Sequence, residues 1–323
     1  MSKIYPPIQP YDSFKLSTID GHSLHVEQSG NAEGIPVLYL HGGPGGGIAP
    51  FIRRVFNPRK YRLISFDQRG CGQSTPFLSL ENNTSDHLLG DIEQLRQHLH
   101  IPQWLVCGGS WGSTLSLLYA IKHPEMVSGM ILRGIFLGRQ QDLDWLLHSQ
   151  GGAAQVFSDQ YQYLIEDLPA DNLSTNDIIK HFYHQFTGHN ELQRIAAAKR
   201  WSSWEMHIAQ MHCVASSLPE ESMHTVLSLA VLECHYMHHH CFIDEGFILN
   251  NVQRIADIPG ILIHGRYDMV CKIEGAHKLH QHWPNSELCI VPNAAHSGSD
   301  PLIANAFCKA TDAMAEFLKQ KSP

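Results

Sequence analysis

The pentapeptide GGSWG at residues 108–112 constrains the fold most strongly, because it fits the pattern GxSxG. It lies between a short apolar run at 104–107 and a helix-like run at 113–121. A buried strand that turns sharply into a helix is the usual setting of this pattern, and its glycines make room for the strained backbone. Such a turn holds a serine hydroxyl out at the edge of a sheet, so Ser110 is the candidate nucleophile.

A glycine-rich loop, HGGPGGG at 41–47, precedes this turn and follows the apolar run 37–40, which is typical of a buried parallel strand. Two fixed backbone N–H groups can stabilise the oxyanion of a tetrahedral intermediate without reorganising. We assign this role to Gly43 and Trp111. The alternatives are a flexible turn or a nucleotide loop, but no Lys-Ser or Lys-Thr follows and no acidic partner supports a dinucleotide fingerprint.

An acid and a histidine follow in the order that the pattern requires. The strand-like run 261–264 precedes Asp268, and the run 288–291 precedes His296. An ionised Asp268 would fix the tautomer of His296, which would then deprotonate Ser110. Because the chain holds 23 histidines, His296 is distinguished by its place after the last predicted strand.

Longer motifs extend this pattern over nearly the whole chain. They are HGGPGGG at 41–47, DQRGCGQS at 67–74, GGSWGSTLSL at 108–117, LRGIF at 132–136, WSSWE at 201–205, LECHY at 232–236, HGRYDMVC at 264–271 and PNAAHS at 292–297. With these motifs the chain resembles the proline iminopeptidases, or prolyl aminopeptidases, of the α/β-hydrolase superfamily. The resemblance implies release of an N-terminal proline from small peptides through an acyl-enzyme, with Ser110, Asp268 and His296 as the triad.

The resemblance further implies that Glu205 and Glu233 bind the imino group of the substrate and that Phe136 contacts its ring. A secondary ammonium has two N–H donors, so paired carboxylates in a dry pocket supply both charge and geometry. They would also reject internal peptide positions, which lack the charge. The alternative is that both glutamates are ordinary exposed helix residues. Three further aromatic side chains are either walls of the pocket or plain core: Trp201, Trp204 and Tyr236.

The chain departs from the family pattern beside the triad. Ala295 stands where a glycine commonly precedes the histidine, and Lys272 stands where a proline commonly follows the cysteine. The stretch 146–153 also aligns poorly. None of these changes removes a catalytic atom, but they leave open how strictly proline is preferred.

The order of predicted elements favours an α/β-hydrolase fold with a mostly parallel sheet and an inserted helical cap. A chain of 323 residues, 43% of them apolar, can bury a large core. Helical patterns at 176–186, 191–209 and 223–236 lie in a region without a convincing strand. We therefore predict a core domain at 1–136 and 253–323 and a cap at 137–252, with the site in the cleft between them. Strands are predicted near 13–17, 23–28, 37–40, 61–66, 104–107, 127–132, 261–264 and 287–291.

Composition bounds the remaining possibilities. The N-terminus has no apolar targeting region and no run of eighteen apolar residues occurs, which predicts a cytoplasmic protein without a membrane segment. Eight irregularly spaced cysteines are then expected to be reduced thiols. The formal charge of −8 argues against binding to nucleic acid or anionic membranes. The triad needs no cofactor and no metal, and the oligomeric state stays open.

Two features allow other interpretations. His235, His238, His239 and His240 have a spacing that could hold a metal on a helix face, although no HExxH motif accompanies them. Cys271 follows Asp268 by three residues, so a bulky thiol reagent bound there would disturb the triad.

Other functions remain possible for the same fold. A carboxylester or amide hydrolase would use this triad on a different acyl group, but an apolar ester has no use for the two cap glutamates. Epoxide hydrolases and dehalogenases of this fold carry an aspartate where this chain has Ser110. A catalytically silent binding protein would have no need of an intact triad.

Overall fold

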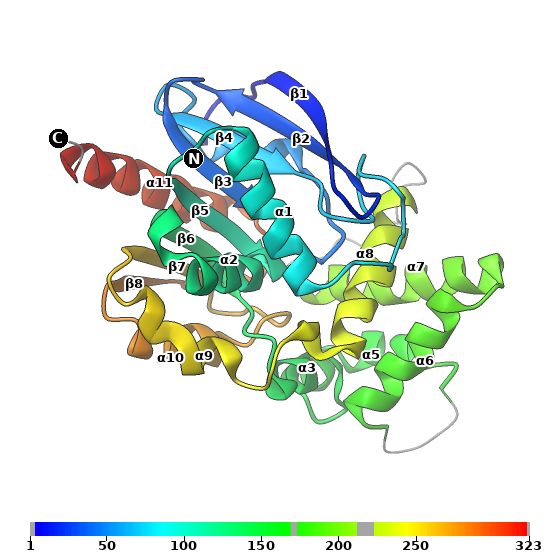
Figure 1. The fold of residues 1–323 in the computed structure, drawn as a ribbon. Helices are drawn as coiled ribbons and strands as arrows, with labels where there is room; N and C mark the ends of the chain where they lie inside the picture. The colour runs from blue at the N-terminus through cyan, green and yellow to red at the C-terminus, as the bar shows by residue number, and fades with distance from the viewer. Residues whose placement is uncertain (1–3, 169–172, 212–222, 322–323) are drawn as a thin grey trace.

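An eight-stranded sheet runs through the molecule in the order β1-β2-β4-β3-β5-β6-β7-β8 (Figure 1). The computed structural model describes residues 4–168, 173–211 and 223–321. β1 and β2 are antiparallel to their neighbours, and the strands from β4 to β8 are parallel. All eight predicted strands are present, and the predicted α/β-hydrolase fold is confirmed. Their bounds are β1 (Pro10–Ser17), β2 (Ser23–Gly30), β3 (Ile35–Leu40), β4 (Tyr61–Phe66), β5 (Trp104–Ser110), β6 (Val127–Ile135), β7 (Gly260–Gly265) and β8 (Ser286–Val291).

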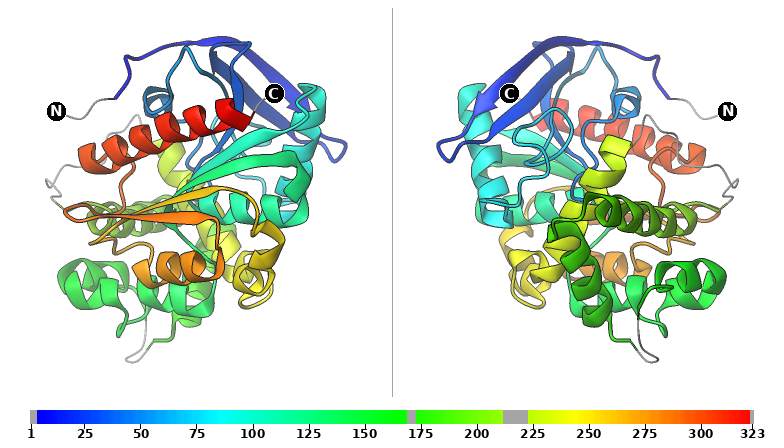
Figure 2. Two further views of the ribbon diagram at one scale, coloured as in Figure 1. Left: turned by 90° about the vertical axis from the view of Figure 1, so that its left-hand side faces the viewer. Right: turned by 90° about the vertical axis from the view of Figure 1, so that its right-hand side faces the viewer.

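Helices cover both faces of the sheet, as parallel strands of apolar residues require. The helices are α1 (Ser85–His98), α2 (Trp111–Lys122), α9 (Phe247–Asn251) and α10 (Ile273–His282) on one face, and α11 (Pro301–Lys321) on the other. Leu38 and Val106 belong to the apolar cluster of the first face. Val37 and Cys107 belong to that of the second. Figure 2 shows α1 and α11 on opposite sides of the sheet.

A block of helices between β6 and α9 forms a separate apolar cluster, which we call the cap. Figure 1 shows most of it below and to the right of the sheet. The three predicted cap helices are present, each end within two residues of the prediction. The domain boundaries at 136/137 and 252/253 remain a prediction. The cap helices are α3 (Gln140–Leu147), α4 (Gly152–Val156), α5 (Ser158–Leu164), α6 (Thr175–Thr187), α7 (Glu191–Ile208) and α8 (Met223–His238).

Short 3-10 turns complete the connections between these elements. They are η1 (Pro50–Arg54), η2 (Pro124–Met126), η4 (His240–Phe242) and η5 (Val252–Ile255). No helix within the described residues is long and apolar enough to span a membrane. Seven of the eight cysteines lie in the described part of the chain, and these seven are free thiols. The eighth, Cys213, lies outside the described residues.

Helix α8 joins the cap to the loops of the sheet domain. Ser228 Oγ donates a hydrogen bond to the carbonyl oxygen of Gly45 at 2.8 Å. The ring of His235 bonds through Nε2 to the carbonyl oxygen of Asn83 at 3.0 Å, and the hydroxyl of Tyr236 donates to the Asn83 side chain at 2.9 Å. The first bond places α8 against the glycine-rich loop, and the other two attach it to the loop before α1.

Candidate active site

Ser110 lies at a strained turn between β5 and α2. Its backbone has φ 59° and ψ −127°, a conformation that non-glycine residues rarely adopt. The turn fits into the structure because Gly108 and Gly112, two residues before and after Ser110, have no side chain. A Cβ at Gly112 would lie 2.0 Å from the carbonyl oxygen of Leu40. At Gly108 a Cβ would lie 2.2 Å from the carbonyl oxygen of Gly112. The predicted sharp turn is therefore present, and both glycines of the GxSxG pattern are sterically required.

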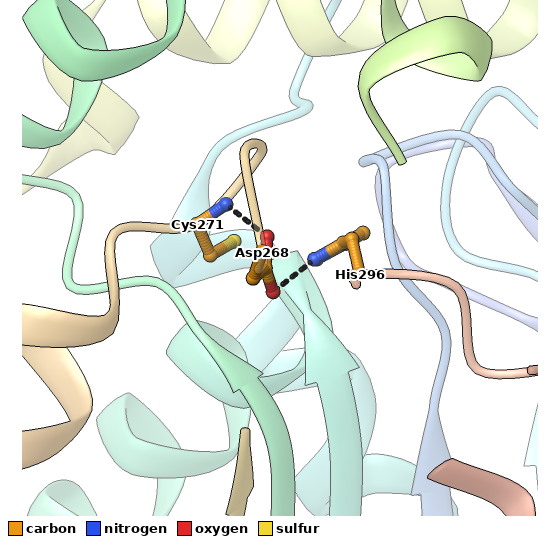
Figure 3. A group of neighbouring side chains, drawn as sticks. All are labelled: Asp268, Cys271 and His296. Atoms are coloured by element: carbon orange, nitrogen blue, oxygen red, sulfur yellow. Dashed lines mark hydrogen bonds and ion pairs between the residues drawn. The ribbon is translucent and has the colours of Figure 1, made fainter. Parts of the chain in front are cut away.

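Asp268 and His296 form a hydrogen-bonded pair in the loops after β7 and β8 (Figure 3). His296 Nδ1 lies 2.8 Å from Asp268 Oδ2. The other carboxylate oxygen, Oδ1, accepts the backbone N–H groups of Val270 at 3.0 Å and Cys271 at 2.7 Å. Both oxygens of Asp268 therefore have partners, which fixes its orientation and that of the imidazole.

The electrostatics of Asp268 favour the ionised carboxylate. Burial by itself would raise the pKa of Asp268, but the charge and hydrogen bond of His296, His264 and the N–H of Cys271 outweigh it. The pKa of Asp268 is therefore held below its ordinary value. An ionised Asp268 keeps the proton of His296 on Nδ1 and leaves Nε2 free to act as a base.

His264, which the sequence analysis did not single out, lies beside the Asp268–His296 pair. It is fully buried, and its Nδ1 accepts the backbone N–H of Ile135 at 3.1 Å. Its proton is therefore on Nε2, which donates to the carbonyl oxygen of Cys271 at 2.9 Å and lies 3.5 Å from Asp268 Oδ2. Burial lowers the pKa of His264, against the opposing charge of Asp268. Its place at the end of β7, four residues before Asp268, is the signal that was available.

The glycine-rich loop packs directly on the nucleophile. A Cβ at Gly42 would lie 3.2 Å from Ser110 Cβ, and Gly43 has φ +108°. Trp111 is the first residue of α2, where a backbone N–H has no acceptor within the helix. The loop thus runs beside Ser110 on one side while α2 begins on the other. The assignment of Gly43 and Trp111 to the oxyanion remains a proposal.

Gln68 connects the glycine-rich loop to the start of α2 and was not identified from the sequence. Its backbone N–H donates to His41 Nε2 at 3.0 Å, and its side-chain Nε2 donates to the His41 carbonyl oxygen at 3.0 Å. Its Oε1 accepts the indole N–H of Trp111 at 2.9 Å. Gln68 therefore holds the start of the glycine-rich loop against the start of α2. Its motif, DQRGCGQS, was the available signal.

A cavity of about 340 Å³ opens beside Ser110. Among the predicted site residues it is lined by Ser110, His296, Gly43 and Glu205. Phe136 follows β6 and packs partly buried against both the sheet cluster and the cap cluster, and it is not part of this lining. Its contact with the substrate ring remains a proposal.

Glu205 on α7 lines the cavity and is hydrogen-bonded to Glu233 on α8, so neither is an ordinary exposed helix residue. Glu233 is 4% exposed and accepts the indole N–H of Trp201 at 2.7 Å, whereas Glu205 is half-buried. Burial raises the pKa of Glu233 well above its usual range, and the charge of Glu205 raises it further. Burial also raises the pKa of Glu205, against the charge of His296 and a hydrogen bond from Glu233. Both carboxyl groups are therefore harder to ionise than an exposed glutamate.

The three other aromatic residues of the cap motifs belong to the apolar core. They are at most 2% exposed, and none lines the cavity: Trp201, Trp204 and Tyr236. The indole of Trp201 orients Glu233, and the hydroxyl of Tyr236 bonds to Asn83. Their role at the site is therefore indirect.

The histidines at 235–240 make contacts of another kind than metal ligation. His235 bonds to the Asn83 carbonyl, and the ring of His238 stacks on Tyr183 with 4.0 Å between centroids. A metal site needs several ligand atoms close together. Among the described residues, three possible ligand atoms lie within 4.8 Å of one another in one group, which is Asp268, Cys271 and His296. In that group the carboxylate oxygens and His296 Nδ1 are already hydrogen-bonded, as a catalytic pair requires.

Of the two departures beside the triad, Lys272 keeps a backbone that proline would share. It is the N-cap of α10 with φ −62°. Ala295 is 3% exposed, and the carbonyl oxygen of this residue lies 2.1 Å from where a Cβ of Gly265 would be. The loop before His296 is therefore packed tightly on the end of β7.

The fold and the site define the class of this protein. The chain matches a family model described as the alpha/beta hydrolase fold over residues 35–300. Among solved structures it is similar to an esterase from Exiguobacterium antarcticum, with a TM-score of 0.61, 20% identity and coverage of 94% and 98% of the two chains. It is also similar to a haloalkane dehalogenase variant from Bradyrhizobium elkanii, with a TM-score of 0.65, 14% identity and coverage of 96% and 99%. The protein is an α/β hydrolase.

Full-length relatives narrow this class. The chain is 43% identical to a probable proline iminopeptidase of Leptolyngbya boryana, over 100% of this chain and 99% of the relative. It is 42% identical to the proline iminopeptidase of Xylella fastidiosa strain Temecula1, over 97% and 99%, and 43% identical to that of Arabidopsis thaliana, over 96% and 82%. The chain belongs to the proline iminopeptidase family.

Proposed function

We propose that this protein is a serine aminopeptidase that releases an N-terminal proline from peptides. The observation that carries the proposal is the coincidence of two features at one cavity. Ser110 and His296 line it together, with Asp268 bonded to His296 at 2.8 Å, and the same cavity is lined by Glu205, which is paired with the buried Glu233. The first feature supplies acyl transfer, and the second supplies recognition of a cationic chain end.

The proposed reaction uses these groups in turn. Ser110 Oγ attacks the prolyl carbonyl carbon while His296 Nε2 takes its proton, and the oxyanion accepts the N–H groups of Gly43 and Trp111. The C–N bond then breaks as His296 returns the proton to the leaving amine. Water, deprotonated by His296, attacks the prolyl ester and releases proline with Ser110 restored. Asp268 stays ionised throughout and stabilises the imidazolium.

The two glutamates explain why such an enzyme acts at the chain end. A prolyl N-terminus is a secondary ammonium with two N–H donors, and it meets carboxyl groups that burial has made costly to ionise alone. Binding of the cation stabilises their ionised form. An internal proline has no charge and no N–H at this position, so it leaves the pair unsatisfied.

The test is hydrolysis of aminoacyl chromogenic amides by the purified protein. Free prolyl amide is expected to be cleaved much faster than the alanyl, leucyl and N-blocked prolyl amides, and Ser110→Ala is expected to remove turnover while leaving the fold intact. Equal cleavage of the blocked substrate, or activity on simple esters alone, would assign the triad to a carboxylester or amide hydrolase. The cytoplasmic location predicted from the sequence remains part of this proposal.

A further inference from the structure

The active-site cavity extends from Ser110 along the face of the sheet that α11 covers. This part of its lining is mostly apolar, and it comes from η1 and the residues around it and from α11. The apolar side chains are Phe51, Ile52, Val55 and Phe307. One cationic side chain, Arg133 of β6, also lines the cavity.

Two glycines, Gly109 and Gly298, leave room for the Arg133 guanidinium close to Ser110 and His296. Arg133 pairs with Gly109 across β5 and β6, and a Cβ at Gly109 would lie 2.5 Å from a guanidinium nitrogen. A Cβ at Gly298 would lie 3.3 Å from Arg133 Nε. Arg133 Nη1 donates to the carbonyl oxygen of His296 at 2.6 Å. The guanidinium thus lies flat over the residue before Ser110 and touches the main chain of the catalytic histidine.

Arg133 differs from the buried arginines of the protein in its partners. Each arginine that is buried among the described residues forms an ion pair with a carboxylate: Arg53 with Glu27, Arg69 with Asp91, Arg139 with Asp142 and Arg200 with Asp167. Arg133 is half-buried, and within the described ranges no carboxylate oxygen lies within 4.0 Å of it. Withdrawing a guanidinium from water without a counter-charge is costly, and a planar guanidinium binds carboxylates in bidentate fashion.

We propose that Arg133 binds the C-terminal carboxylate of a short peptide substrate, a dipeptide or tripeptide. This inference rests on the proposed function. Such a substrate carries a positive and a negative chain end, and the cavity is lined by both Glu205 and Arg133. One or two residues after the scissile bond span about 3.5–7 Å. The guanidinium contacts the residue before Ser110 and the main chain of His296, so in this proposal it receives such a chain end. The apolar walls of the cavity then accommodate the side chain after proline.

The experiment compares matched substrates that differ in the terminal charge. For the unmodified protein, kcat/KM for prolyl-alanine is expected to exceed that for prolyl-alaninamide at least tenfold, mainly through KM. The preference should persist for prolyl-alanyl-alanine against its amide and should vanish for a prolyl pentapeptide against its amide. This comparison needs no variant, so it does not depend on whether a substituted chain folds.

Variants then locate the effect. Arg133→Gln is expected to bring the acid-to-amide ratio near one, and Arg133→Lys to restore part of it. The matched control is Arg266→Gln, which removes an exposed charge near Asp268 and should keep the ratio. Equal kcat/KM for acid and amide in the unmodified protein, or a parallel loss on both in Arg133→Gln, would overturn the inference alone. Failure to cleave any prolyl peptide or prolyl arylamide would overturn the proposed function with it.

Discussion

Glu205 and Glu233 show how burial gives ordinary side chains a specific chemistry. On an exposed helix each would be ionised at neutral pH with little consequence. Here burial raises the pKa of both carboxyl groups, and the indole N–H of Trp201 fixes one oxygen of Glu233 at 2.7 Å. Both carboxyl groups are therefore harder to ionise than an exposed glutamate, mainly because they are buried. In the proposed function, the arriving cation makes their ionisation favourable.

Replacing either carboxylate tests that role. Glu205→Gln or Glu233→Gln is expected to reduce kcat/KM for a prolyl amide by about 10–100-fold, since a hydrogen bond to a charged group contributes about 1.5–3 kcal/mol. Hydrolysis of a neutral activated ester should change little. Steady-state kinetics on both substrates provide the measurement, with Ser110→Ala as the variant that loses both. Equal losses on the two substrates would contradict the recognition role.

The raised pKa values also predict a pH dependence. A carboxyl group with a raised pKa takes up its proton at a higher pH than an ordinary glutamate, whose pKa is about 4.3. As the pH falls through that raised pKa, Glu205 loses its charge and binds the ammonium less well. KM for the prolyl amide should therefore increase at a pH where KM for the neutral ester is still constant. Parallel KM profiles for the two substrates would argue against it.

Cys271 contacts the triad from its main chain and its side chain. Its N–H donates to Asp268 at 2.7 Å, its Sγ lies within 4.8 Å of ligand atoms of Asp268 and His296, and the residue is 3% exposed. Burial first, and the charge of Asp268 second, raise the pKa of this thiol well above its usual range. It is therefore a neutral, shielded thiol that reacts slowly, because the thiolate is the reactive form.

A bulky thiol reagent is accordingly expected to act in two stages. The exposed Cys289 should react first without loss of activity, and slower reaction of Cys271 should then abolish turnover by displacing Asp268. Thiol counting in parallel with an activity assay measures both stages. Cys271→Ser is expected to stay active throughout, and its inactivation at the rate of the unmodified protein would assign the effect to another cysteine.

At the scale of elements, the turn from β5 into α2 depends on close approach to β3. The carbonyl oxygen of Leu40 at the end of β3 lies 2.0 Å from the position of a Cβ at Gly112. Backbone atoms cannot yield as a flexible side chain can, so any side chain at Gly112 forces α2 away from the sheet. The same movement shifts Ser110 and the first N–H of α2.

Two glycine substitutions separate this effect from helix propensity. Gly112→Ala is expected to destabilise the protein by about 3 kcal/mol and to reduce turnover more than 100-fold. Gly90→Ala, in α1 where a Cβ meets nothing within 4 Å, should stabilise it by about 0.5–1 kcal/mol without affecting turnover. Urea unfolding and a prolyl amide assay give both quantities. Unchanged activity in Gly112→Ala would mean that the backbone shifts to accommodate the methyl group without displacing Ser110, which contradicts the prediction.

At the scale of the whole molecule, a buried histidine of the cap, His235, is hydrogen-bonded to the sheet domain. His235 is 6% exposed and uses Nε2 to bond the carbonyl oxygen of Asn83. Its Nδ1 has no partner among the described residues. Burial lowers the pKa of His235 to about 4, against the hydrogen bond to Asn83, and the charges of His239 and His238 lower it further. One of the side chains of α8 that attach the cap is thus a histidine that is neutral at pH 7.

This predicts loss of stability in mild acid. In the unfolded chain a histidine has a pKa of about 6.5, so between pH 6.5 and pH 4 the unfolded state binds more protons and stability falls as pH falls. From pH 7 to pH 4.5, His235 accounts for about 2–3 kcal/mol of this loss. Urea unfolding at several pH values should give a shallower slope for His235→Gln than for the unmodified protein. Identical slopes would exclude His235 as the source.

Much of the fold was predictable because its signals are local. Strands follow from short apolar runs, the nucleophile turn from glycines beside Ser110, and the order of Asp268 and His296 from their places after strands. The cap helices follow from their periodicity. Each of these signals acts within one element or one turn, so a single sequence carries it.

Contacts between distant segments were decided by tertiary packing alone. The sequence suggested Glu205 and Glu233 through a resemblance, but their burial and mutual hydrogen bond depend on how α7 and α8 cross. Gln68, His264 and Arg133 were missed, since their partners lie on distant segments of the chain that only tertiary packing brings near. By itself the sequence determined the fold and the order of the catalytic residues, because backbone geometry and hydrophobic periodicity are local. Only the tertiary structure decided which charges are buried, paired or left for a substrate, because desolvation and Coulomb interactions depend on three-dimensional distance.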